Sequence, residues 1–423
     1  MFGSYRRKRT WKGRFDTDIQ PKKENKKLKK IVKKTATAVA ASAIMVSVSG
    51  QAMAGDKYLE ALEDRLATLE RELNIMQRDA KGKNIVADNE VPVYVTPKSK
   101  YVDELKISGR VQYQFGYVNS SEGNYSTQEF RRVRLGVEGK LQDDFKFKLS
   151  MNLLPNDVSL DEVLLQYVAY DEIQPFIGVV KPRFSLEETT SSARILTIER
   201  SNIVNTLSTG KIIGAGIEGE LGWFNYSVGV YNGEGEGYNT NTENVNSRYL
   251  YNASIGADFG KVALRADYMY SDDDPKFNSN VQSDYQHNFS GSAALNLGRF
   301  DFTTEFLWAE SFEGDSVWGV IAMPSFYLVP KKLQFVVRGE YSEGDSGDSL
   351  RAPSRYLRRV TGIVDGGRGD EYYAVYGGLN YYLHGNDLKF MLGAEYSKLE
   401  DKIQGDGGSI DGVTVWGAVR MLF

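Results

Sequence analysis

The chain has 423 residues, a net charge of −4 at pH 7, two histidines and no cysteine. The lack of cysteine excludes a disulfide framework, and the scarcity of histidine argues against a conventional zinc site and against a nucleophile that needs a histidine base. We therefore expect no metal, no cofactor and no enzymatic activity, and the acidic balance argues against nucleic acid as a partner.

Residues 1–54 have the three parts of a secretory signal peptide: a basic segment at 6–34, an uncharged apolar segment at 35–50, and an A-x-A cleavage sequence ending at Ala54. The apolar segment is shorter than the ~18 residues that a spanning helix needs. We predict cleavage after Ala54; the long basic part indicates a misplaced start codon or an extended signal. The alternative is a basic nucleic-acid-binding arm followed by a core helix. Since residues 1–54 carry 14 Lys and Arg against 3 Asp and Glu, the rest of the chain has a net charge of −15.

A heptad repeat follows at residues 55–81. Its apolar positions have the alternating spacing of three and four that is typical of a coiled coil, at Leu59, Leu62, Leu66, Leu69, Leu73 and Met76. Three heptads are too few to hold chains together unaided, so we expect support from an attached oligomer. The alternative is one amphipathic helix packed on a globular domain. Residues 82–104 contain two prolines and no period, and we predict a linker.

From residue 105 to 423 apolar and polar residues alternate, which indicates β-strands. In one such run Leu264 and Ala266 would lie on one face, and Arg265 and Asp267 on the other. We predict 16 strands, joined in turn by tight turns such as LQDD and HGND and by long loops rich in Gly, Ser, Asn and Asp. Such alternation of short turns and long loops is typical of transmembrane β-barrels.

The polar face of the strands distinguishes a membrane barrel from a soluble sandwich. Nearly every strand carries charged or amide residues on one face and long apolar or aromatic residues on the other. About 16 such antiparallel strands can close into a ring with lipid outside and water inside. We therefore predict an all-β transmembrane barrel over residues 105–423, preceded by a short coiled-coil helix. A secreted β-helix or adhesin is the alternative, but no repeat of fixed period supports it.

The last predicted strand covers residues 411–423. Val413, Val415, Val419 and Met421 form its apolar face, together with Phe423. A strand with a free edge would be prone to aggregation. We therefore expect this strand to pair with both the first and the fifteenth strand, and its apolar face to contact lipid.

The stretch FIGVVKPRFSLEETTSSARILTIERSNIVNTL, residues 176–207, resembles the phosphate-selective porin O and P family. The matching positions are Gly178, Lys181, Phe184, Leu186, Glu187, Thr190, Ser191, Glu199 and Arg200. Similar pieces occur at 130–139, 327–341 and 377–396, so that the resemblance covers about residues 105–423. It implies a homotrimeric porin of the bacterial outer membrane, with its N-terminal segment in the periplasm and its third loop folded into the lumen. The terminal Phe423 also resembles the aromatic residue that such barrels present to the outer-membrane assembly machinery.

The candidate site follows from this resemblance, because the third loop would narrow the channel. We expect Lys181, Arg183, Arg194 and Arg200 to enter the lumen with Glu199, and Arg132 and Arg134 to line the wall. For Glu199 and Arg200 the alternative is a buried pair that pins the loop to the wall. For Lys181 and Arg183 it is a pair of solvated charges at the end of a strand.

These expectations lead to a passive channel for small hydrophilic solutes and ions. Between residues 181 and 200, four cations face three carboxylates, so we predict weak selectivity without a saturable phosphate site. The alternatives are an anion- or phosphate-selective porin, and a structural barrel that tethers the envelope and whose lumen is plugged. Hydrolase activity, as in some outer-membrane barrels, is not expected because neither His287 nor His384 lies near a nucleophile motif.

Overall fold

A computed structural model of the chain describes residues 93–95, 101–154, 157–233, 249–272, 283–360, 367–403 and 409–423. The predicted signal peptide and coiled coil lie outside these residues and stay predictions. The predicted linker, residues 82–104, includes one short strand, β1 (Val93–Val95), and the first residues of β2.

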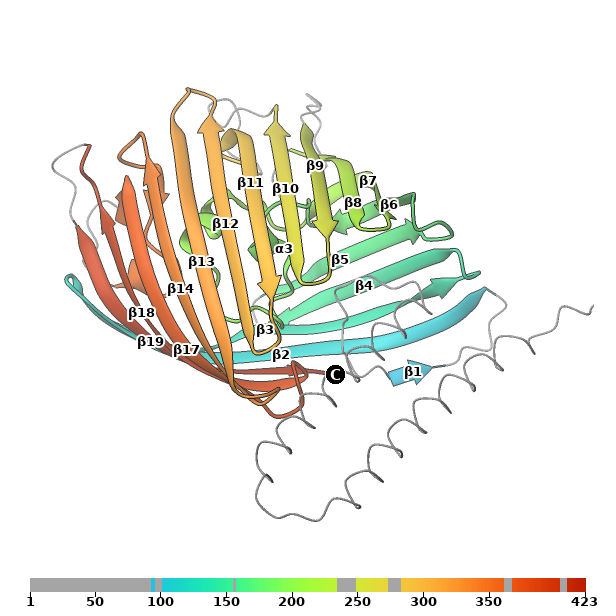
Figure 1. Ribbon diagram of the computed structural model, residues 1–423, viewed down its shortest axis with the longest axis horizontal. Helices are drawn as coiled ribbons and strands as arrows, with labels where there is room; N and C mark the ends of the chain where they lie inside the picture. The colour runs from blue at the N-terminus through green and yellow to red at the C-terminus, as the bar shows by residue number, and fades with distance from the viewer. Residues whose placement is uncertain are drawn as a thin grey trace, which may run out of the picture. The chain divides into compact units, whose positions relative to one another are not determined.

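Sixteen strands form a closed antiparallel barrel (Figure 1), as predicted. In chain order they are β2 (Val102–Ser120), β3 (Gly123–Leu141), β4 (Phe145–Leu154), β5 (Asp157–Tyr167), β6 (Gln174–Val180), β7 (Ile212–Leu221), β8 (Phe224–Asn232), β9 (Tyr249–Asp258), β10 (Val262–Ser271), β11 (Tyr285–Asn296), β12 (Phe300–Ser311), β13 (Ser316–Val329), β14 (Leu333–Gly344), β17 (Glu371–Tyr382), β18 (Leu388–Glu400) and β19 (Ile410–Leu422). Each strand pairs with the next, and β19 pairs with both β18 and β2, so that the ring has no open seam. The prediction that the last strand closes the barrel is confirmed.

The two faces of the barrel wall have opposite polarity. On β19, Val413 and Val415 are 45% and 42% exposed on the outer face, whereas Thr414 and Arg420 on the inner face are buried. Leu264 is likewise exposed, and Arg265 points inward to Asp267 at 2.7 Å. An apolar exterior around a polar interior is the arrangement of a barrel surrounded by lipid.

The connections differ between the two rims of the barrel. Tight turns such as 222–223, 259–261 and 330–332 join strands on one rim, and the long connections 181–211 and 345–370 leave from the other. Both long connections fold inward. The first contains α3 (Leu186–Thr189) and α4 (Asn202–Leu207); the second contains β15 (Leu350–Arg351), the 3-10 helix η1 (Leu357–Arg359) and β16 (Arg368–Gly369).

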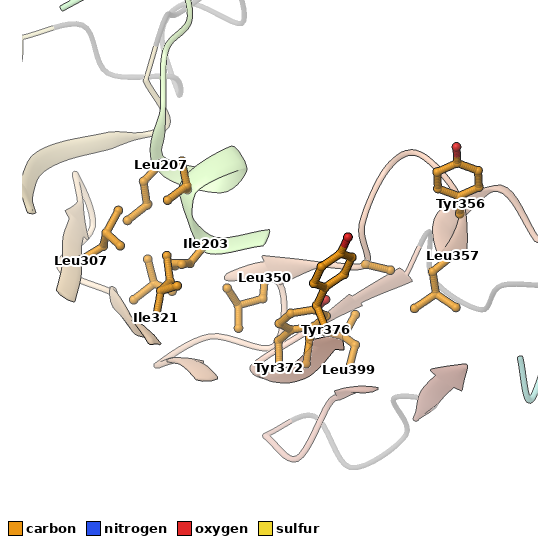
Figure 2. Close-up of a cluster of buried hydrophobic side chains, with 14 of the residues drawn as sticks. Ile203, Leu207, Leu307, Ile321, Leu350, Tyr356, Leu357, Tyr372, Tyr376 and Leu399 are labelled. Carbon is orange, nitrogen blue, oxygen red and sulfur yellow. The ribbon is translucent and has the colours of Figure 1, made fainter. Parts of the chain in front are cut away.

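An apolar cluster fixes these two connections inside the ring (Figure 2). Ile203 and Leu207 of α4 pack near Leu307 and Ile321 of the wall, and Leu350 of the second connection lies beside them. Burying these side chains on the inner face stabilises the inward position of both loops, because apolar area is removed from a water-filled lumen. Along the described chain, helices are short, and none has the length and apolar character required to span a membrane.

The strand β1 extends the seam of the barrel. It pairs with β2 over Leu105–Ile107, next to Gly109, whose backbone exchanges hydrogen bonds with Phe423. The edge of β2 that β19 leaves uncovered is therefore paired with β1.

Candidate functional site

The third loop, residues 181–211, begins with a local helix start. Ser185 adopts a positive φ of 63°, and its hydroxyl accepts a hydrogen bond from the backbone N–H of Glu188 at 3.2 Å. The sequence Ser-x-x-Glu is the signature of a capping box, which favours a helix at this position. The local sequence of the loop therefore favours a helix that begins at Leu186.

Carboxylates of the wall hold the N-terminal ends of both loop helices. Glu305 of β12 accepts the N–H groups of Leu186 and Glu187 at 2.8 and 3.2 Å, and Glu340 of β14 accepts the N–H of Ile203 at 2.7 Å. These N–H groups have no partner within a helix and carry partial positive charge, so an inward carboxylate satisfies them.

Cations of the wall hold carbonyl and carboxylate groups of the loop. Arg420 of β19 donates to the carbonyl oxygens of Ser192 at 2.6 Å and Ile198 at 2.5 Å, and Lys389 of β18 donates to that of Ile195 at 3.1 Å. Arg338 of β14 bridges Glu187 of the loop, at 3.2 Å, and Glu395 of β18, at 2.8 Å. The loop is thus fastened to strands on several sides of the ring.

Beside the loop lies a cavity of about 630 Å³, here called the inner cavity. Its lining comes from the loop and from the wall between β2 and β7. Eight cations and four carboxylates line it: Arg110, Arg132, Arg134, Lys148, Lys181, Arg183, Arg200 and Lys211, with Asp161, Glu162, Glu188 and Glu218. The inner cavity is therefore strongly charged and has a net excess of positive groups.

The carboxylates of the inner cavity are all paired with cations. Asp161 contacts Arg134 at 2.8 Å and Lys211 at 2.6 Å, and Glu162 contacts Lys148 at 3.3 Å and Lys211 at 2.6 Å. Glu218 lies 3.8 Å from Arg183, and Glu188 contacts both Lys181 and Arg200. Arg132 instead donates to the neutral Gln112 at 3.1 Å.

Two β-bulges decide which charges face the lumen. The register of β2 and β3 shifts between Gln112 and Tyr113, so that Arg131 and Arg132 both point inward. A shift between Ser150 and Met151 on β4 does the same for Asp161 and Glu162 of β5. A bulge inserts one unpaired residue and can re-aim a side chain, which strict alternation does not anticipate.

Five of the seven predicted site residues line the inner cavity: Lys181, Arg183, Arg200, Arg132 and Arg134. The other two do not line it. Arg194 is half-buried between α3 and α4, and Glu199 is turned toward the wall, where it contacts Arg131 at 2.9 Å and Gln114 at 2.8 Å. Burial alone would raise the pKa of Glu199, but the charges of Arg131 and Arg132 hold it at about 2.

The alternative of a buried Glu199–Arg200 pair is partly wrong. Glu199 does pin the loop to the wall, but its partner is Arg131. Arg200 braces the loop itself, because it donates to the carbonyl oxygens of Glu187 at 3.0 Å and Thr190 at 2.9 Å. It also lines the inner cavity, so the structural and the solute-contacting interpretations both apply to it.

The sequence prediction missed several cavity residues. Lys148 lies on the polar face of a recognised strand, and Lys211 directly precedes another, so both could have been found by extending the site to neighbouring strands. Asp161 could not, because its inward direction depends on the bulge.

A family model described as phosphate-selective porin O and P matches residues 105–323. The chain belongs to the phosphate-selective porin O and P family. This porin is accordingly a channel of the bacterial outer membrane, and its family and fold are those of channels rather than enzymes. Among the curated proteins compared with it, none matched.

Solved structures share the fold of this porin at low sequence identity. An anion-selective porin from Comamonas acidovorans has a TM-score of 0.55 and 11% identity, covering 75% of this chain and 99% of that one. OmpT, an outer membrane protein of Vibrio cholerae, has a TM-score of 0.53 and 12% identity, covering 77% and 100%. The channel DcaP of Acinetobacter baumannii has a TM-score of 0.52 and 12% identity, covering 77% and 99%.

Proposed function

We propose that this porin passes small hydrophilic solutes and ions by passive diffusion, with a weak preference for anions. The observation that carries the proposal is the inner cavity, where eight cations face four carboxylates. A ring of fixed positive charge raises the local concentration of anions and lowers that of cations in a narrow aqueous path.

The preference is weak because every carboxylate in the cavity is close to a cation. Charges of opposite sign within a Debye length, about 8 Å in physiological salt, largely cancel each other for a passing ion. A tight phosphate site would need several converging cations that are not already paired with acid. We therefore propose passage without saturable phosphate binding.

The preference is for anions because two of the carboxylates of the third loop are held at the wall, away from the inner cavity. A count of the charges along the sequence does not show this. Of the three carboxylates between residues 181 and 200, Glu187 and Glu199 are bound to Arg338 and Arg131 at the wall and do not line the inner cavity. Lys181, Arg183 and Arg200 do line it. The near balance along the sequence thus becomes an excess of positive charge along the path.

Planar-bilayer recording with the purified porin tests the proposal. We expect stepwise conductance and, under a KCl gradient, a reversal potential on the anion-selective side that moves little when phosphate is added. Strong anion selectivity with chloride current blocked by millimolar phosphate would contradict weak selectivity and favour a phosphate-selective channel. Correctly folded protein without conductance would favour the plugged structural barrel.

We also propose that the protein is a homotrimer in outer-membrane lipid, with its N-terminal segment in the periplasm. Phe423 would be recognised by the outer-membrane assembly machinery. The family resemblance supports these points, and the similar OmpT of Vibrio cholerae has a trimer form. A further support is the length of β6, which has 7 residues where a transmembrane strand needs about nine to eleven. A short wall there is better covered by another subunit than by lipid.

A further inference from the structure

The connection between β14 and β17 contacts the same part of the lumen as the third loop. Asn202 of α4 donates to the carbonyl oxygen of Arg351 at 2.7 Å, which joins the two loops directly. Arg355 lies 3.3 Å from Glu129 of β3, and the hydroxyl of Tyr356 accepts a hydrogen bond from Gln114 of β2 at 3.1 Å. This connection therefore reaches across the lumen to the strands that carry the cationic wall.

Apolar contacts fix the connection in that position. Tyr356 and Leu357 are 2% and 1% exposed, and the ring of Tyr356 lies 5.6 Å from that of Trp416 on β19. Trp416 interrupts the polar face of its strand, and its contact with Tyr356 accounts for an apolar side chain there. A loop that only covered the mouth of the barrel would not bury these rings against the inner wall.

Three cavities lie next to one another along this connection, because neighbouring cavities share lining residues. An outer cavity of about 500 Å³ is lined by residues of the long-loop rim, among them Asn202, Asn205 and Ser354. A narrow cavity of about 30 Å³ shares these three residues with the outer cavity and shares Arg200 with the inner cavity. By the same measure of volume it is far smaller than the outer and the inner cavity.

The narrow cavity is lined by three cations, which differ in how far a solute can reach them. The side chain of Arg338 is 3% exposed and that of Arg200 is 9% exposed, whereas that of Arg355 is 33% exposed. The pair of Arg355 with Glu129 is also partly exposed, so solvent screens it and an anion can displace it more easily than the buried Arg338 pairs.

We propose that residues 345–360 form a second constriction element and that Arg355 is a specificity-determining residue of the channel. A solute moving between the outer and inner cavities passes Ser354 and Arg355, and an anion exchanges with Glu129 for contact with the guanidinium of Arg355. This inference rests on the proposed function, because it assigns the narrowest step of the same path.

The absence of cysteine allows a direct test by thiol labelling. In Ser354→Cys, a negatively charged methanethiosulfonate reagent should lower single-channel conductance by about twofold or more, since added bulk at the narrowest step obstructs flow. The matched control is Ser121→Cys, at the exposed tip between β2 and β3, where the same label should leave conductance unchanged. Mass spectrometry confirms that both thiols were modified.

Charge substitution tests the role of Arg355 itself. Arg355→Gln should reduce the anion preference measured by reversal potential, and Arg355→Lys should restore it. Arg299→Gln, at an exposed position in the tight turn between β11 and β12 and outside the three cavities, should leave it unchanged. Conducting protein whose labelled Ser354→Cys variant retains full conductance, or whose Arg355→Gln variant keeps its selectivity, would overturn the inference. Wild-type protein that does not conduct would instead overturn the proposed function.

Discussion

Lys181 illustrates how burial in the lumen alters a single charge. It directly follows β6, donates to the carbonyl oxygen of Glu188 at 2.9 Å, and lies within reach of Arg200. Burial and the charge of Arg200 lower its pKa to about 8, against the opposing influence of the Glu188 carboxylate. Part of the positive charge of the inner cavity is therefore titratable near neutral pH.

We predict that the anion preference falls as the pH rises between about 7 and 9, because Lys181 loses its proton as the pH passes its lowered pKa. Reversal potentials measured at a series of pH values would follow this change. In Lys181→Arg the charge persists at every pH in that range, so its selectivity should stay flat. An identical pH profile in wild type and variant would assign the titration to another group.

On the outer face, Leu264 represents the positions that contact lipid. It lies between two aromatic belts: Trp223 stacks on Phe259 at 5.4 Å near one end of the strands, and Tyr251 lies 6.1 Å from Tyr270 near the other. Aromatic belts mark the two membrane interfaces, so Leu264 lies within the hydrocarbon layer.

Leu264→Arg should lower the free energy of unfolding by about 1–3 kcal/mol, because Leu264 is the third residue of β10 and the cost of a charge rises from about 0–1 kcal/mol at the interface to about 2–4 kcal/mol at the midplane. Leu297→Arg is the matched control, because Leu297 is similarly exposed, at 54% against 47%, but lies in a tight turn at the rim. Its cost should be about 0–1 kcal/mol. Urea unfolding in lipid vesicles measures both values, and equal costs would contradict the assignment of the outer face.

At the scale of elements, the third loop depends on wall residues for its position. Arg420 is fully buried and supplies donors to loop carbonyls that have no other partner described. An unsatisfied buried carbonyl costs about 1–3 kcal/mol, so loss of this guanidinium should loosen the loop more than the barrel.

We predict that Arg420→Gln increases current noise and exposes residues 192–198 to limited proteolysis, while heat-modifiability of the barrel on gels is retained. Lys398→Gln provides the control, since Lys398 pairs with Glu400 on the outer face of the wall instead. Unchanged noise and protease resistance in Arg420→Gln would mean that the apolar cluster around Ile203 suffices to hold the loop.

The strands and the third loop could be predicted, whereas the partners of the loop could not. Alternation identified even the short strand β6, because each residue's face follows from the period of two. Glu199 pairs with Arg131 because a bulge turns Arg131 inward. Arg420 and Lys389 lie on strands more than 180 residues away in the chain from the loop carbonyls that they bind. Such long-range pairings leave no local pattern. The inward path of residues 345–360 was missed for the same reason.

At the scale of the whole molecule, substitutions in the predicted coiled coil at residues 55–81 would test whether it stabilises the proposed trimer. Leu66→Asp combined with Leu69→Asp should weaken trimers without unfolding the barrel, because charges would enter the a/d seam. Native gel electrophoresis after graded heating in detergent measures trimer survival. Glu63→Asp with Glu70→Asp, off the seam, should have no effect. Trimers of equal resistance in both variants would show that the heptads act as a lone surface helix.

Closure of the ring by β19 and β2 has a consequence for the order of folding. Leu422 pairs with Arg110, so the final contacts join positions about 300 residues apart. This pairing joins the first and the last strand of the ring, so its hydrogen bonds form only when β19 has docked on both β18 and β2. A nearly complete barrel would present two unpaired backbone edges at once, and each could recruit a neighbouring chain. The protein must therefore be kept apart from its own copies until its final thirteen-residue strand arrives.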